Sequence, residues 1–109
     1  MVDRRLGKVA AVCLKGQKGM PKYPQPQATV GPYGIEGDYH AGPLDRHVKE
    51  GPPQPNRRQV TIVAKEVLDS VNQLLGTNLQ AGSLGENILL EGHGDLSDLQ
   101  PGDKIKLGN

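Results

Sequence analysis

The stretch QVTIVAKEVLDSVNQLLG, residues 59–76, reads as a strand followed directly by a helix. Residues 59–63 are rich in Val, Ile and Thr, which favour strands. From Ala64 to Leu75 the apolar residues recur at helical spacing, so they share one face of a helix. Gly76 follows at the position where a glycine commonly ends a helix. The sequence therefore predicts a strand over 59–63 and a helix over about 64–75.

The rest of the chain divides into short apolar runs separated by turns. We expect further strands at Gly7–Leu14, Asn87–Glu91 and Lys104–Leu107. Residues 15–32 are expected to form a loop, because proline fixes φ and lacks an N–H donor. Residues 43–57 are also rich in proline and predict an exposed insertion.

These elements predict a mainly β, turn-rich fold made of one domain, residues 1–109. Short strands, one helix and 15 glycines are typical of a small β-barrel with a helix packed on it; an α+β sandwich is the alternative. The chain has no Phe or Trp, so Val, Ile, Leu and Ala must fill the core. A domain of this size buries about two thirds of its unfolded surface, and we expect a homodimer to add buried surface.

Composition excludes several classes of partner and location. The net charge of +1 gives no general attraction to nucleic acid or anionic membranes. No apolar stretch approaches the roughly 20 residues of a membrane span, and no apolar signal segment is present. The single cysteine fits a reducing compartment, so we expect a cytoplasmic protein. The three histidines lack ligand spacing and one cysteine makes no thiolate cluster, so no metal site is predicted.

The densest group of polar residues and glycines is GIEGDYHAG, residues 34–42. Gly34, Gly37 and Gly42 allow positive φ and a close approach of the backbone to a ligand. Asp38 and His40 are two residues apart, so they share a face in extended backbone, where the carboxylate can fix the tautomer of the imidazole. Two interpretations stay open: a ligand-facing loop, or a turn in which Asp38 caps backbone N–H groups.

Three further segments carry candidate site residues. Gly85-Glu86-Asn87 lies at the mouth of a predicted strand and can bond a ligand, or form a structural turn. Arg58 can hold a phosphate or carboxylate through two parallel N–H donors, or end a strand in solvent. The lysines of the 15–32 loop either solubilise it or complete an anion site; they are Lys15, Lys18 and Lys22.

Cys13 lies in an apolar run, where a cysteine usually packs as a small hydrophobe. A reactive thiol needs an electropositive and partly exposed setting. Lys15 is the nearby residue that would supply the charge. A catalytic role for Cys13 therefore stays open beside the structural one.

Together these segments resemble the MOSC domain, named for the C-terminal domain of molybdenum-cofactor sulfurase. The resemblance lies in four ordered motifs: GIEGDYHAG (34–42), RRQVTIVAKE (57–66), AGSLGENILLEG (81–92) and LQPGDKIKLG (99–108). It is closest in content to the small bacterial stand-alone members. It implies a compact, mostly β, barrel-like fold that binds a molybdopterin-type ligand and handles or delivers sulfur.

For this chain the resemblance implies a small binding or sulfur-carrier module for an anionic pterin or molybdenum-type ligand. The partner would be a molybdenum enzyme or a protein of cofactor biosynthesis. Larger relatives carry a pyridoxal-phosphate domain, which nothing in this sequence suggests. The expected ligand-binding residues are Asp38, His40, Arg58, Glu86 and Asn87, with Lys18 and Lys22, and the expected loop glycines are Gly34, Gly37, Gly42 and Gly85.

Two departures from the family pattern limit these expectations. The family's sulfur-handling cysteine normally lies beyond the Gly-Asp strand, whereas this sequence stops at Asn109 and Cys13 does not match that position. The family also passes from His-Ala-Gly to Arg-Gln-Val in a few residues, without the insertion 43–57. We expect a shortened variant to dimerise, since partner strands would cover open edges. Sulfur transfer through Cys13, and a module without chemistry, are the alternative functions, so the question of enzyme activity stays open.

Overall fold

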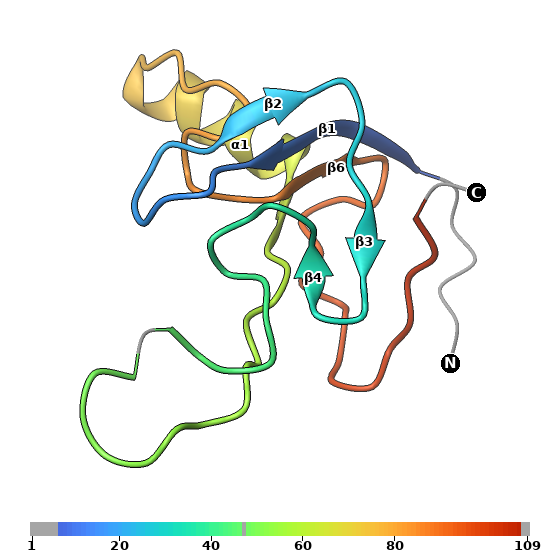
Figure 1. Ribbon diagram of the computed structural model, residues 1–109. Coiled ribbons are helices and arrows are strands. Elements are labelled where there is room, and N and C mark those ends of the chain that lie inside the picture. The colour runs from blue at the N-terminus through green and yellow to red at the C-terminus, as the bar shows by residue number, and fades with distance from the viewer. Residues whose placement is uncertain (1–6, 47, 108–109) are drawn as a thin grey trace.

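The computed structural model describes residues 7–46 and 48–107 and centres on a four-stranded sheet (Figure 1). The strand order is β2-β1-β6-β5. The strands are β1 (Lys8–Leu14), β2 (Tyr23–Gln25), β5 (Ile62–Ala64) and β6 (Ile88–Glu91). β1 pairs antiparallel with β2 and β6, whereas β5 and β6 run parallel. A parallel pair needs a crossover connection, and the helix α1 (Lys65–Leu75) lies in it.

A small hairpin stands beside this sheet and leads into the candidate ligand loop (Figure 1). It consists of β3 (Val30–Gly31) and β4 (Gly34–Ile35), which pair antiparallel. Ile35 is buried, with 1% of its surface exposed. Gly34 lies against Gln59, where an added Cβ would come within 2.7 Å of the Gln59 carbonyl oxygen. This close packing fixes the start of the 34–42 loop against the segment that precedes β5.

The core is thin and aliphatic, as the composition predicts. Three consecutive residues of β6 are buried, which is typical of a central strand covered on both faces. The buried apolar residues are Cys13, Ile35, Ala64, Leu68, Ile88, Leu89 and Leu90. β6 therefore forms the centre of the molecule, between β1 and the β5–α1 unit.

The helix begins one residue later than predicted and ends where predicted. Gly76 adopts the left-handed conformation (φ 66°), and its N–H donates to the carbonyl oxygen of Asn72. The predicted apolar face is only partly covered, because Leu68 is the buried residue of α1 whereas Leu74 is 83% exposed. The helix thus contacts the sheet mainly through its first turns.

A mainly β fold with one packed helix is confirmed. The described strands form an open sheet and a separate hairpin, and we find no closed barrel among them. The predicted loop 15–32 contains β2 and β3. The predicted strand 59–63 begins only at Ile62, because Thr61 donates its backbone N–H to the side chain of Asn87 instead of to a strand.

The alternating segment 104–107 was expected to form a strand and does not form one of the named strands. Only Lys104 has bridge geometry there. An alternating pattern becomes a strand only where a neighbouring strand supplies backbone partners over several residues. No helix within residues 7–46 and 48–107 is long and apolar enough to cross a membrane.

The segment 43–57 projects from the body as a long loop, drawn in green in Figure 1, and most of its described residues are exposed. An isolated bridge between Leu44 and Pro55 closes its base. Asn56 ties it to the ligand loop, since its side-chain amide donates to the carbonyl oxygens of His40 (2.6 Å) and Gly42 (2.8 Å). The insertion therefore braces the 34–42 loop.

Candidate functional site

A buried ionic cluster of Lys22, Asp38 and His40 lies under the 34–42 loop. The Lys22 ammonium donates to Asp38 Oδ2 at 2.8 Å and lies 3.0 Å from His40 Nδ1. The side chains of Lys22 and Asp38 are 2% and 0% exposed, and that of His40 is 23% exposed. Asp38 and His40 therefore meet as the sequence predicts, and Lys22 joins them from a segment 16 residues earlier in the chain.

The Asp38 carboxylate is held ionised by its surroundings. Burial raises its pKa. Hydrogen bonds from the Lys22 side chain and from the backbone N–H groups of His40 and Lys15, together with the charge of Lys22, lower the pKa by more than burial raises it. The net pKa therefore lies below the ordinary value. These two backbone donors lie 3.1 and 3.2 Å from the carboxylate oxygens. Asp38 thus caps backbone N–H groups and also bonds Lys22.

The backbone of Lys22 is fixed by the turn around Gly82. The N–H of Lys22 donates to the Gly82 carbonyl oxygen at 2.9 Å. A Cβ at Gly82 would collide with the Lys22 carbonyl oxygen, and Gly82 has a positive φ of 87°. Only glycine fits both conditions. This contact places the Lys22 ammonium inside the molecule. The sequence allowed two interpretations of this lysine, a solubilising residue or part of an anion site, and burial removes the first.

Glu86 and Asn87 are buried and bonded to the protein itself. Glu86 accepts the backbone N–H groups of Gly82 (2.9 Å) and Leu84 (3.2 Å), so it shapes the turn that holds Lys22. Asn87 donates to the carbonyl oxygen of Cys13 and accepts the N–H of Thr61, at 3.1 Å each. Both side chains thus form the structural hydrogen bonds that were the alternative to ligand binding. Their contact with a ligand stays a prediction.

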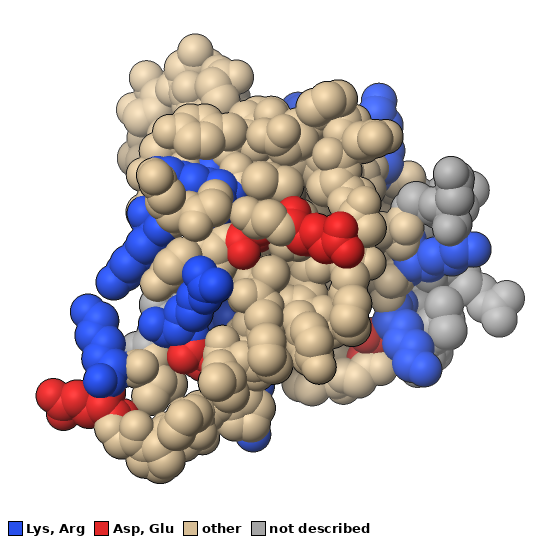
Figure 2. All heavy atoms as spheres, in the orientation of Figure 1, with Lys and Arg blue, Asp and Glu red and all other residues tan. Residues whose placement is uncertain are grey.

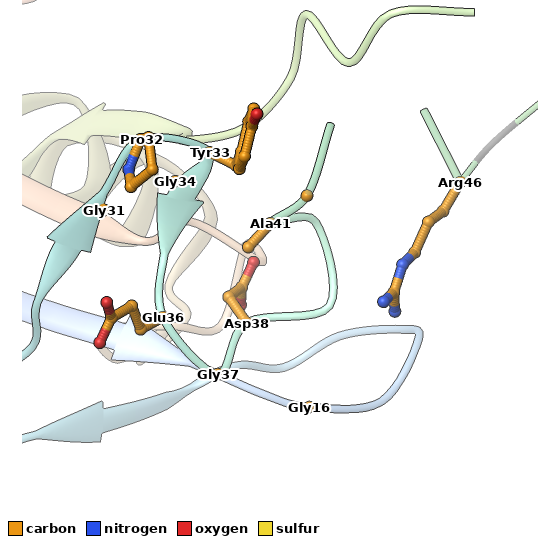
Figure 3. A pocket seen from close by; sticks show the side chains of 11 residues that line it. Gly16, Gly31, Pro32, Tyr33, Gly34, Glu36, Gly37, Asp38, Ala41 and Arg46 are labelled. Carbon is orange, nitrogen blue, oxygen red and sulfur yellow. The ribbon is translucent and has the colours of Figure 1, made fainter. Parts of the chain in front are cut away.

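A pocket of about 500 Å³ opens beside the cluster and is rich in glycine, with the side chains of Glu36 and Arg46 on its walls (Figure 3). Its lining residues come from the β1–β2 loop, the β3–β4 hairpin, the ligand loop and the 43–57 segment. They are Gly16, Gly31, Pro32, Tyr33, Gly34, Glu36, Gly37, Asp38, Ala41, Gly42 and Arg46. Because the Asp38 side chain is inaccessible, it supports the wall from behind. The 34–42 loop is therefore the main wall of a pocket.

Two charged residues that line this pocket, Glu36 and Arg46, are not among the site residues predicted from the sequence. Arg46 belongs to the 43–57 segment. Its guanidinium carbon lies 4.7 Å from the centre of the Tyr39 ring, and the side chain points back toward the pocket (Figure 3). Tyr39 in turn meets the ring of His40 edge-on, with 5.6 Å between ring centres. Arg46 lies in the 43–57 insertion, which has no counterpart in the expected family pattern, so no local sequence signal marks it.

Other predicted site residues lie outside the described lining of this pocket. Arg58 has an exposed side chain, while its backbone N–H donates to Asn56 Oδ1 at 3.0 Å. Lys18 is exposed in the β1–β2 loop. Gly85 lies against Met20, where a Cβ would come within 2.9 Å of Met20 Cγ. Gly85 is therefore needed for packing, and ligand contacts of Arg58 and Lys18 stay predictions.

Cys13 is 1% exposed in β1, and burial, with the charge of Glu86, raises the pKa of its thiol to about 11, against an opposing effect of Lys22. At neutral pH it is a protonated, inaccessible thiol, as expected of a cysteine in an apolar run. Within residues 7–46 and 48–107, no group of three or more His, Cys, Asp and Glu side chains could hold a metal ion.

Comparison with known proteins agrees with this fold. A solved structure, the YUAD protein from Bacillus subtilis, has 24% identical residues and a TM-score of 0.77. The match covers 89% of this chain and 58% of that one, so the chain spans little more than half of that protein's length. At this identity the likeness shows the fold alone. No protein of curated function matches. A sequence model of the MOSC domain matches residues 36–109, which is more than half of the chain, so the chain belongs to the MOSC domain family.

Proposed function

We propose that this chain binds an anionic, pterin-type ligand of molybdenum-cofactor metabolism in the pocket beside the 34–42 loop. The MOSC domain is associated with the molybdenum cofactor. The observation that carries the proposal is a glycine-rich pocket with the Arg46 guanidinium beside it. The pocket and the guanidinium suit a charged small molecule, and the Lys22–Asp38–His40 cluster supports the loop behind them.

The size and the walls of the pocket fit such a ligand. Pockets for small molecules and cofactors span about 300–1,000 Å³, and this one measures about 500 Å³. At Gly42 an added Cβ would meet no atom within 4 Å, so the space in front of its backbone is open. A ligand can therefore approach the loop backbone closely at Gly42, whose own N–H is already donated to the Tyr33 carbonyl oxygen.

The charges around the pocket suggest how a ligand would lie. Arg46 and Glu36 lie on opposite sides of the pocket (Figure 3). A guanidinium matches the oxygens of a phosphate, whereas a carboxylate accepts the amino and ring N–H groups of a pterin. Figure 2 shows further Lys and Arg side chains over the β1–β2 loop and beside the 43–57 segment, with Asp and Glu side chains on the same face. The phosphate would bind near Arg46 and the pterin edge near Glu36.

The proposal covers binding and leaves sulfur transfer out. Persulfide chemistry needs an accessible thiolate, and the one cysteine of the chain is buried with a raised pKa. A bound molybdenum cofactor would supply the metal and its redox chemistry. The residues of this chain would hold and orient it, with Arg46 and Glu36 at its two ends and the loop backbone along its face.

The test is isothermal titration calorimetry of the purified protein, first with a pterin phosphate and, separately, with molybdate. A hydrogen bond to a charged group contributes about 1.5–3 kcal/mol, so Arg46→Ala should weaken binding of the pterin phosphate by about tenfold or more. Arg57→Ala is the matched control, an exposed arginine that does not line this pocket. Arg58→Ala tests the arginine that the family resemblance favours.

The proposal is overturned if no saturable binding occurs, or if Arg57→Ala weakens binding as much as Arg46→Ala. Saturation by molybdate alone, with equal affinity in the Glu36→Gln variant, would show that an oxyanion and not a pterin is recognised.

We also expect a homodimer, since Val30 (59%) and Leu74 (83%) are exposed apolar residues. Sedimentation of the purified chain would decide between a monomer and a dimer.

A further inference from the structure

The contact between Lys22 and the His40 ring has a consequence for the imidazole. The Lys22 Nζ lies 2.8 Å from Asp38 Oδ2 and 3.0 Å from His40 Nδ1. An ammonium has three protons to donate and no lone pair to accept with. Beside an ionised carboxylate at this distance, the lysine is the donor to both neighbours. His40 Nδ1 must then offer a lone pair, which means that it carries no proton.

We propose that Lys22 is a positioning residue that fixes His40 as the neutral tautomer with its proton on Nε2. A proton on Nδ1 would point at the ammonium 3.0 Å away, and the other acceptor near it, Asp38 Oδ2, lies at 3.7 Å, beyond hydrogen-bond distance. Charged and titratable side chains near the ring include Lys22, Asp38 and Tyr39, with Arg46 over the ring of Tyr39.

The backbone holds the ring in the required place. The His40 N–H donates to Asp38 Oδ2 at 3.1 Å, and its carbonyl oxygen accepts the Asn56 amide at 2.6 Å. The same carboxylate oxygen therefore accepts both the Lys22 side chain and the His40 backbone. Asp38 aligns the two partners, and these bonds fix the backbone from which the ring extends toward Lys22.

This tautomer fixes the hydrogen-bond character of the two ring nitrogens of His40. A neutral imidazole with its proton on Nε2 is a hydrogen-bond donor at that atom. Nδ1 is then the acceptor for the Lys22 ammonium. The tautomer is a property of the protein without ligand and is tested in that state, so the result does not depend on the proposed function.

The experiment is long-range ¹H–¹⁵N NMR of the histidine rings in the purified, ligand-free protein at neutral pH. The His40 signals are assigned by their loss in His40→Gln. We expect Nδ1 to give the signal of an unprotonated, hydrogen-bonded nitrogen and Nε2 that of a protonated one. A protonated Nδ1 in the wild-type protein overturns the proposal, and this measurement needs no lysine variant.

Lys22→Met tests the cause. Without the ammonium, the Asp38 carboxylate remains 3.7 Å from Nδ1 and attracts a proton to that nitrogen. We expect the Nδ1 signal to move toward the protonated position, whereas Lys18→Met, an exposed lysine of the same loop, leaves it unchanged. An unchanged Nδ1 signal in folded Lys22→Met protein overturns the role of Lys22. If Lys22→Met does not fold, the double variant Lys22→Met/Asp38→Asn removes both buried charges and takes its place. In the double variant the Nδ1 signal should lose the shift caused by the hydrogen bond from Lys22. A shift that persists would overturn the role of Lys22.

Discussion

Replacing Lys22 by Met removes one partner of a buried ion pair and leaves the other in place. The two side chains are 2% and 0% exposed, and their atoms lie 2.8 Å apart. Breaking a buried pair by removing one partner costs about 3–5 kcal/mol, because the remaining charge stays buried without compensation. A domain typically has a total stability of about 5–15 kcal/mol. Lys22→Met should therefore remove a large share of the free energy of unfolding.

The assay is equilibrium unfolding in urea, followed by circular dichroism. The chain offers a matched control, since Lys65 and Asp69 form an ion pair at the same distance of 2.8 Å on the surface of α1. Exposed pairs contribute little because water screens them, so Lys65→Met should change the urea midpoint far less than Lys22→Met. Equal midpoints for the two variants would refute the reasoning that burial makes the difference.

A double variant separates the lost charge from the lost contacts. Lys22→Met/Asp38→Asn leaves no unpaired charge in the interior, so it should recover part of the stability that Lys22→Met loses. If the double variant loses as much stability as the two single variants together, or more, the ammonium and the carboxylate do not stabilise each other.

Three further predictions follow from the site. The pKa of Asp38 is lowered on folding, so the ionised carboxylate stabilises the folded protein above the unfolded pKa of about 3.9, and this stabilisation is lost as the pH falls toward the folded pKa. The difference in free energy of unfolding between wild type and Asp38→Asn should therefore shrink between pH 6 and pH 3. A constant difference would contradict an ionised Asp38. The pKa of the Cys13 thiol is raised to about 11, so alkylation at pH 8 should be at least about 100-fold slower in the folded chain than in urea; similar rates would show that the thiol is accessible. Gly82→Ala should destabilise the protein more than Gly94→Ala, because both have positive φ (87° and 64°) but only at Gly82 does the new Cβ collide with Lys22; thermal unfolding measures this, and equal losses would mean that the Gly82–Lys22 contact is easily relaxed.

Some elements of this chain can be predicted from short stretches of sequence. The helix over residues 65–75 follows from apolar spacing and from Gly76, which needs only its own backbone freedom. β1 and β6 follow from short apolar runs, although three residues of β6 are buried and only Cys13 of β1 is. The Asp38–His40 juxtaposition also follows locally, since two residues of spacing and flanking glycines already bring a carboxylate near an imidazole. For these features the determining interactions lie within a few residues.

Other elements depend on partners that no local pattern reveals. The predicted strand 59–63 is shortened because Asn87 bonds Thr61 from 26 residues away. The barrel suggested by many short strands is not closed among the described residues, because closure requires pairing between strands and not only their presence. The family resemblance identified the loop as part of a MOSC domain, but it did not place Arg46.

The sequence by itself determined the class of fold, the helix and the loop that walls the pocket, because these depend on side-chain spacing and on backbone freedom. Only the tertiary structure decided which charges the loop meets. Lys22 is one lysine among three in a polar loop by sequence, and it becomes a buried partner of Asp38 and His40 because the Gly82 turn holds its backbone inside. A buried charge is stable only beside its partner, and the fold, not the local sequence, brings that partner within 3 Å of it.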